Sequence, residues 1–151
     1  MSHEVFMREA LQLARDNIEA GGRPFGALVV KDGRVIARAA NSIHLNADPT
    51  AHAELLAIRR ASAHLASPRL EGCVIYASGH PCPMCLAAMH LCGVAGAYFA
   101  YSNDDGEPFG LSTAAVYQQM TQPPQWQALP LLALRPSGED GLYERWQERR
   151  S

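Results

Sequence analysis

The chain has 151 residues and a formal net charge of −2 at pH 7. The length predicts one domain over residues 1–151, and the charge disfavours a nucleic-acid-binding protein, because phosphate binding normally requires a basic face. No apolar run approaches the roughly 20 residues that cross a bilayer, and residues 1–8 do not resemble a signal peptide. We therefore expect a cytoplasmic protein that has no membrane partner.

The first forty residues predict a helix followed by a β-hairpin. Apolar residues recur at nearly helical spacing over residues 4–20 and end at a Gly-Gly pair. Two short apolar runs, 25–30 and 35–40, then flank the dipeptide Asp32-Gly33. Asp-Gly between two such runs is typical of a tight hairpin turn.

The rest of the chain predicts alternating helices and strands. Asp48-Pro49-Thr50 indicates a helix start, with a capping side chain and a proline in the first turn. The predicted segments are a loop over 41–49, a helix to residue 64, a strand over 73–78, a turn over 79–83, a helix over 84–91, a strand over 95–101, a loop over 103–110, a helix over 111–120, a connector over 122–127, a strand over 129–135 and a helix over 137–149.

This order of elements predicts an α/β fold. Helices that alternate with strands pack on both faces of one sheet. We therefore expect a three-layer αβα arrangement around a central mixed five-stranded sheet.

Two short segments carry the chemistry, residues 50–54 and residues 81–85. Cys82 and Cys85 lie three positions apart at the start of a predicted helix, so both thiols can reach one ion. His52, near the start of the other helix, can supply a third ligand. Three protein ligands leave a tetrahedral Zn2+ site with one open position, which is typical of a catalytic site.

Glu54 lies two positions from His52, so on a regular helix the two side chains point in different directions. This spacing argues against Glu54 as a fourth ligand. A carboxylate just beyond the metal is instead placed to take a proton from the zinc water and return it. The sequence therefore predicts Glu54 as the catalytic acid–base group.

These residues lie in a pattern that resembles the cytidine deaminase-like superfamily over nearly the whole chain. His-x-Glu followed by Pro-Cys-x-x-Cys is the signature of zinc nucleobase deaminases. Residues 24–27, Asn41, 48–54 and 81–85 are most similar to the bacterial guanine deaminases. The resemblance implies hydrolytic removal of an amino group from a nucleobase-like aminoheterocycle, a purine base such as guanine, by attack of zinc hydroxide with Glu54 as proton shuttle.

The resemblance also implies a substrate pocket. Phe25 corresponds to the aromatic residue that lies against the base, and Asn41 to the asparagine that hydrogen-bonds the ring. The backbone N–H of Ala53 is a further candidate contact. Phe25 also fits a core position, and Asn41 also fits a simple turn residue.

Several positions depart from the guanine deaminase pattern. His80 stands where Glu usually precedes Pro-Cys, and the sequence assigns it no role. Ser112 and Thr113 stand where that family has an acidic pair, whose second acid binds the 2-amino group. Asp104 and Asp105 are candidates to replace it, and a pterin, a triazine or a modified purine is an alternative substrate.

The C-terminal helix carries aromatic residues, as the guanine deaminase tail does. In that family the tail closes over a site, in some members over the site of a partner subunit. Tyr143 or Trp146 are candidates for this contact, and both also fit helix anchors on the sheet. The resemblance further implies a homodimer.

Two other functions remain open. A tRNA adenosine deaminase shares residues 48–54, but it requires a basic face, and the net charge and Phe25 count against it. A non-catalytic zinc-binding module would hold zinc with four protein ligands and would not need Glu54.

Overall fold

The computed structural model describes residues 2–150. The chain divides into two compact units, Met1–Tyr117 and Gln118–Ser151. The first unit contains a four-stranded sheet with the order β2-β1-β3-β4. β1 is antiparallel to β2 and to β3, whereas β3 and β4 are parallel, so the predicted mixed sheet is confirmed. The strands are β1 (Gly26–Lys31), β2 (Arg34–Ala40), β3 (Cys73–Gly79) and β4 (Gly96–Tyr101).

Helices connect and follow these strands. The helices are α1 (His3–Glu19), α2 (Ile43–Asn46), α3 (Ala53–Leu65), α4 (Pro83–Cys92), α5 (Asn103–Gly106), α6 (Ala114–Met120) and α7 (Leu142–Arg150), with short 3-10 helices at Glu107–Phe109 and Pro124–Trp126. None of the helices described in residues 2–150 is long and apolar enough to cross a membrane.

The prediction of a single domain over residues 1–151 stays a prediction.

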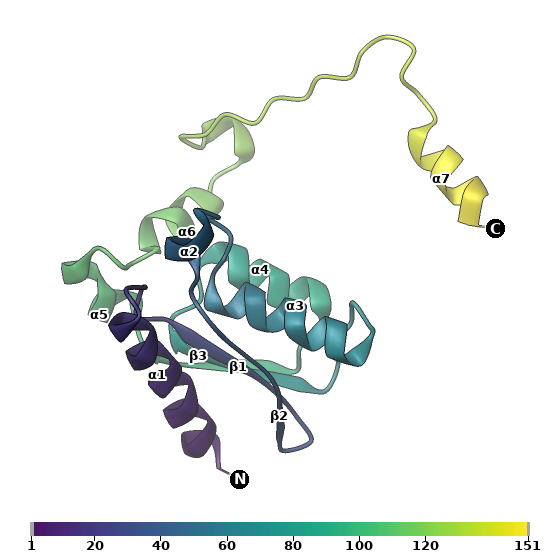
Figure 1. Ribbon diagram of the computed structural model, residues 1–151. Helices are drawn as coiled ribbons and strands as arrows, with labels where there is room; N and C mark the ends of the chain where they lie inside the picture. The colour runs from purple at the N-terminus through teal and green to yellow at the C-terminus, as the bar shows by residue number, and fades with distance from the viewer. Residues whose placement is uncertain (1, 151) are drawn as a thin grey trace. The chain divides into compact units, whose positions relative to one another are not determined.

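Both faces of the sheet are covered, which confirms the three predicted layers (Figure 1). Along β1 the side chains alternate in direction, as strand geometry requires. Ala27 and Val29 belong to the buried cluster formed with α3 and α4. Leu28 and Val30 belong to the cluster formed with α1 on the opposite face. A strand that is buried and free of polar side chains from Gly26 to Val30 is therefore a central strand of a three-layer fold.

The predicted hairpin is also confirmed. Asp32 and Gly33 have φ angles of 51° and 74° and connect Lys31 to its partner Arg34. Two consecutive residues with positive φ form the type of turn that matches the twist of a tight hairpin.

The predicted fifth strand is wrong. Residues 129–135 form no strand, and three of their leucines, Leu131, Leu132 and Leu134, are 69%, 78% and 91% exposed. The apolar pattern of this segment is compatible with a strand, but a strand also requires a neighbouring strand that accepts and donates its backbone hydrogen bonds. In the part of the chain that the structure describes, this segment has no such neighbour.

Several helices also differ from the predictions: α6 begins at Ala114 rather than at residue 111, and α7 at Leu142 rather than at residue 137. The short helix α2 lies inside the predicted loop over 41–49, and α3 begins at Ala53 rather than at residue 50. The side chain of Asp48 accepts hydrogen bonds from the backbone N–H and the hydroxyl of Thr50. These bonds stabilise a local turn, so the helix begins only after the extended residue His52.

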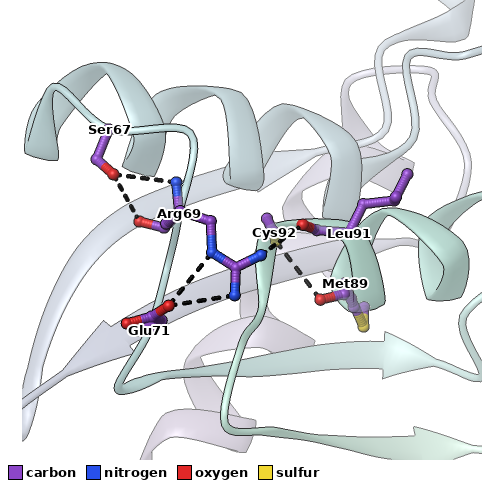
Figure 2. A network of polar contacts seen from close by, with 6 residues as sticks. All are labelled: Ser67, Arg69, Glu71, Met89, Leu91 and Cys92. Atoms are coloured by element: carbon purple, nitrogen blue, oxygen red, sulfur yellow. Dashed lines mark hydrogen bonds and ion pairs between the residues drawn. The ribbon is translucent and has the colours of Figure 1, made fainter.

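The C-terminal end of α4 is held by the loop that leads into β3 (Figure 2). Arg69 donates from Nη1 to the carbonyl oxygen of Leu91 at 3.0 Å. Its Nε and Nη2 donate to Glu71 Oε1 at 3.3 and 3.2 Å. Helix α4 then ends at Gly93, whose φ is 75°. A guanidinium at this end satisfies a helix carbonyl and interacts favourably with the helix dipole.

We expect Gly93→Ala to lower the free energy of unfolding by about 1–2 kcal/mol. Alanine would have to adopt the left-handed backbone conformation of Gly93, which strains a residue with a Cβ atom. That Cβ would also lie 2.2 Å from Nη2 of Arg69, so the guanidinium would have to move away from α4. Urea unfolding of the two proteins measures the difference. Gly96→Ala is the matched control, because nothing lies within 4 Å of its Cβ position. Equal losses in the two variants would contradict the proposed strain.

Candidate metal centre

Three potential metal ligands from two separate segments lie together at one end of the sheet. His52, Cys82 and Cys85 each offer one ligand atom, and these atoms lie within 4.8 Å of one another. His52 Nδ1 is 3.4 Å from Cys82 Sγ and 3.6 Å from Cys85 Sγ. The three residues predicted as metal ligands are thus brought together by the fold.

The start of α4 places both thiols. Cys82 occupies the N-cap position in an extended conformation, and Pro83 is the first helical residue. Proline suits this position because its missing N–H would have no intrahelical acceptor. Cys85 follows in the first turn and is fully buried. Hydrogen bonds from Cys85 and His52 lower the pKa of Cys82, which favours the thiolate that binds metals.

A fixed loop before α3 places His52, which occupies the N-cap position of that helix. The turn closed by Asp48 and Thr50 precedes it, and Arg59 donates to the Thr50 hydroxyl at 3.4 Å. The backbone N–H of Ser42 donates to the carbonyl oxygen of Ala51 at 3.0 Å. These contacts fix the backbone of the residues directly before His52.

The donor set fits a zinc ion. Tetrahedral zinc with bonds of about 2.0 Å to nitrogen and 2.3 Å to sulfur separates a nitrogen and a sulfur ligand by about 3.5 Å. The observed separations of His52 Nδ1 from the two sulfur atoms are 3.4 and 3.6 Å. One imidazole and two thiolates also suit zinc chemically, and three ligands leave one position of a tetrahedron open.

Glu54 lies beside these ligands in the first turn of α3. Its side chain is 7% exposed and lies next to the Cys85 thiol. Burial raises the pKa of the Glu54 carboxyl to about 7. Because His52 occupies the cap and Glu54 the first turn, the carboxylate does not join the ligand cluster, as the sequence predicted from their spacing. A buried carboxylate next to a metal centre can accept and release a proton.

Asn41 is held so that only its amide nitrogen lacks a protein partner. Its backbone N–H donates to Phe25, its carbonyl oxygen accepts from Asn17, and its Oδ1 accepts from the N–H of Ile43. The side chain is 3% exposed, and among residues 2–150 no acceptor contacts Nδ2. The amide nitrogen can therefore donate to a ligand. The amide oxygen at the same time stabilises the local turn, because it accepts the N–H of Ile43.

Phe25 packs against the end of β3. A Cβ on Gly79 would lie only 3.0 Å from the Phe25 ring, so glycine there permits the close approach. The ring also packs against the buried cluster on the α3 side and contributes to a cavity of about 490 Å3 next to α1. This cavity is lined also by His80 and Asp105, but neither the three ligand candidates nor Glu54 lines it, so Phe25 combines a packing position with a ring surface outside the ligand cluster. Ala53, next to the ligand His52, is the first residue of α3, where backbone N–H groups have no intrahelical acceptor.

The remaining predicted site residues are not brought to this cluster by any contact in the described chain. Asp104 is exposed, and Asp105 accepts the Ser102 N–H in the capping box of α5. Tyr143 lies in the second unit and is 79% exposed. Their substrate contacts stay predictions.

The structure adds Tyr117, which the sequence analysis did not identify. Its hydroxyl donates to the carbonyl oxygen of Pro81, and its ring lies edge-on to His80, with the centroids 5.3 Å apart. Burial, followed by the charges of the two metal-ligand thiols and of the Glu54 carboxylate, raises the Tyr117 pKa. No local signal could have found it, because Tyr117 is one aromatic residue in an ordinary helical segment. His80 lies between Tyr117 and Phe99, so its ring supports the turn that carries Cys82.

Ser112 and Thr113 precede α6 and behave differently. The Ser112 hydroxyl accepts the Ala114 N–H at 3.1 Å and caps the helix. The Thr113 backbone N–H donates to Asn103 Oδ1, whereas its buried hydroxyl has no hydrogen-bond partner among residues 2–150. A buried hydroxyl without a partner is rare.

Similarities to known proteins agree with this site. Residues 1–122 match the MafB19-like deaminase family. The chain is 34% identical to the guanine deaminase of Bacillus subtilis (strain 168) over 97% of this chain and 95% of that protein. It is 45% identical to the tRNA-specific adenosine deaminase of Aquifex aeolicus (strain VF5), over 60% of each chain.

Solved structures of guanine deaminases are also similar to this chain. The crystal structure of the Bacillus subtilis guanine deaminase matches with a TM-score of 0.92 and covers 98% of this chain and 95% of that one. The structure of the Nitrosomonas europaea guanine deaminase matches with a TM-score of 0.70 at 34% identity, covering 74% of this chain and 65% of that one.

Proposed function

Because the chain belongs to the MafB19-like deaminase family, we propose that it is a zinc-dependent deaminase that hydrolyses the amino group of a purine base such as guanine. The observation that carries the proposal is the cluster of His52, Cys82 and Cys85 beside the buried carboxyl of Glu54. The overall reaction replaces a ring C–NH2 group by C=O, consumes one water and releases one ammonia.

The residues of the chain divide this work between them. His52, Cys82 and Cys85 would hold the zinc ion, which would supply Lewis-acid activation of a water molecule. Glu54 would hold the transferred proton at a carboxylate oxygen and pass it to the departing amino group. Its burial removes competing bulk water from the carboxylate.

The pocket residues orient the ring. Phe25 offers an apolar ring surface, and the free amide hydrogens of Asn41 offer donors to ring nitrogen or oxygen atoms. The first amide of α3, at Ala53, offers a further donor. A flat heterocycle held at three points presents its amino-bearing carbon in one orientation.

The similarity to guanine deaminases over nearly the full chain supports guanine as the substrate. Thr113 stands where the guanine deaminase pattern has an acid, and in the described chain no contact places its buried hydroxyl at the ligand cluster. The choice of guanine therefore rests on the similarity.

Ammonia release from the zinc-loaded protein tests this proposal. The panel contains guanine, adenine, cytosine, their nucleosides, aminopterins, aminotriazines and a tRNA. We expect guanine to react fastest. Reaction of another heterocycle alone would contradict guanine but keep the deaminase, and reaction of the tRNA alone would favour an adenosine deaminase of tRNA. If the zinc-loaded protein releases ammonia from none of these compounds, a non-catalytic zinc-binding module is favoured.

The homodimer and the cytoplasmic location stay predictions. A small heterocyclic base is the partner that the proposed function requires. Size-exclusion chromatography with light scattering measures the oligomeric state directly.

A further inference from the structure

Four polar side chains are buried in the described chain, Asn17, Asn41, Glu54 and Ser78. Glu54 and Asn41 already belong to the proposed site. Asn17 and Ser78 have no place in it, yet both make hydrogen bonds with the loop that carries Phe25. A buried polar side chain is retained at a cost unless it is hydrogen-bonded, so its partners indicate its role.

Asn17 joins two loops through one nitrogen atom. Its Nδ2 donates to the carbonyl oxygen of Arg23 at 2.7 Å and to that of Asn41 at 2.8 Å. An amide nitrogen has two hydrogens, so these two bonds use its whole donor capacity. One carbonyl lies two residues before Phe25, and the other belongs to Asn41 itself. The two predicted pocket residues are thus tied to the same side chain of α1.

Further bonds make this connection rigid. The N–H of Asn41 donates to the carbonyl oxygen of Phe25 at 3.0 Å, which closes a ring of contacts through Asn17. The hydroxyl of Ser78 accepts from the N–H of Gly26 at 3.0 Å and donates to the carbonyl oxygen of Pro24 at 3.4 Å. The residues on both sides of Phe25 are therefore fixed to β3.

The surroundings of Asn17 are tightly packed. A Cβ on Gly22 would lie 2.5 Å from Asn17 Nδ2 and 2.4 Å from the His44 ring. The Gly22 backbone therefore lies close against the amide. The bond to the Asn41 carbonyl is buried, and the bond to the Arg23 carbonyl is partly buried, so water competes least for the bond that holds Asn41.

From these contacts we propose that Asn17 is a positioning residue that fixes Phe25 and Asn41 relative to each other. Among residues 2–150 the Asn17 side chain hydrogen-bonds to Arg23 and Asn41 and to none of the metal ligands or Glu54, so its effect is confined to the residues around Phe25 and Asn41. The kinetic meaning of this role rests on the proposed function, since Phe25 and Asn41 bind the base only in that case.

The test compares Asn17→Asp with the wild-type chain. Aspartate has the same shape but no N–H donor, so both carbonyl oxygens lose their partner. We expect faster hydrogen–deuterium exchange in residues 22–28 and 40–47, and unchanged exchange in α4. With the base that the wild-type protein deaminates, we expect KM to rise by about ten-fold or more while kcat changes less than about three-fold. Zinc content stays at the wild-type level.

Two further variants keep the test decisive. Asn17→Ser keeps one donor and serves if Asn17→Asp does not fold; we expect the same changes at smaller size. Gln12→Ala is the matched control, because it removes an exposed amide from the same helix. Unchanged exchange in both loops, or a fall in kcat with constant KM, would overturn the positioning role. If the wild-type protein deaminates nothing, the proposed function fails, and the exchange rates still decide the role of Asn17.

Discussion

The variant Glu54→Gln is expected to lower kcat for deamination by about 100- to 10,000-fold, the range for loss of a positioned proton-transfer group. Glutamine keeps the size of the side chain but cannot carry the proton from water to the departing amino group. Since the residue is buried, a neutral amide costs less in desolvation than a charged carboxylate. Steady-state ammonia release and zinc content by atomic absorption measure the two quantities together.

Glu19→Gln is the control for this experiment. Glu19 lies on the exposed end of α1 and should leave turnover unchanged. If Glu54→Gln keeps turnover within about three-fold, Glu54 is not the proton shuttle. If it loses zinc instead, the carboxylate contributes to metal binding, which the ligand geometry does not indicate.

The second large effect is expected at Cys85. Cys85→Ser replaces a thiolate by a hydroxyl at the metal centre and should weaken zinc binding by more than about 100-fold, since changes beyond the ligands already cost 10–100-fold. Deamination should be lost with the metal. Competition between the protein and a chromogenic zinc chelator gives the dissociation constant.

Cys73→Ser is a matched control for the cysteine experiment. Cys73 is as fully buried as Cys85, but it lies in the core of β3 and outside the ligand cluster. Both variants place a hydroxyl in a buried position, so both should lower the free energy of unfolding by about 1–3 kcal/mol. Only Cys85→Ser should lose zinc. Equal zinc affinities in the two variants would contradict the assignment of Cys85 as a ligand.

The two cysteine ligands could be predicted from the spacing of residues that are close together in the sequence. Cys82 and Cys85 lie on one helical turn, and their spacing alone places both thiols near one point. The open site and the separate role of Glu54 followed from the number and spacing of the residues. The hairpin at Asp32-Gly33 is equally local, because positive φ at two positions selects one kind of turn.

Other features depended on contacts between distant segments. The start of α3 shifted because the side chain of Asp48 stabilises a turn instead of capping a helix. Tyr117 joined the site through a hydrogen bond to a residue 36 positions away. Asn17 joined it through the carbonyl of Asn41, 24 positions away. A lone tyrosine or asparagine in a helical segment carries no local sign of such a partner.

The sequence by itself therefore predicted the three residues that cluster as candidate ligands, the buried carboxyl beside them and the layered α/β class, because helical spacing, turn chemistry and strand alternation act over a few residues. The tertiary structure decided the number of strands, since residues 129–135 have the composition of a strand but no neighbour to complete its hydrogen bonds. It also decided which side chains hold Phe25 and Asn41 together, because those bonds form only when α1, β1 and β3 have packed.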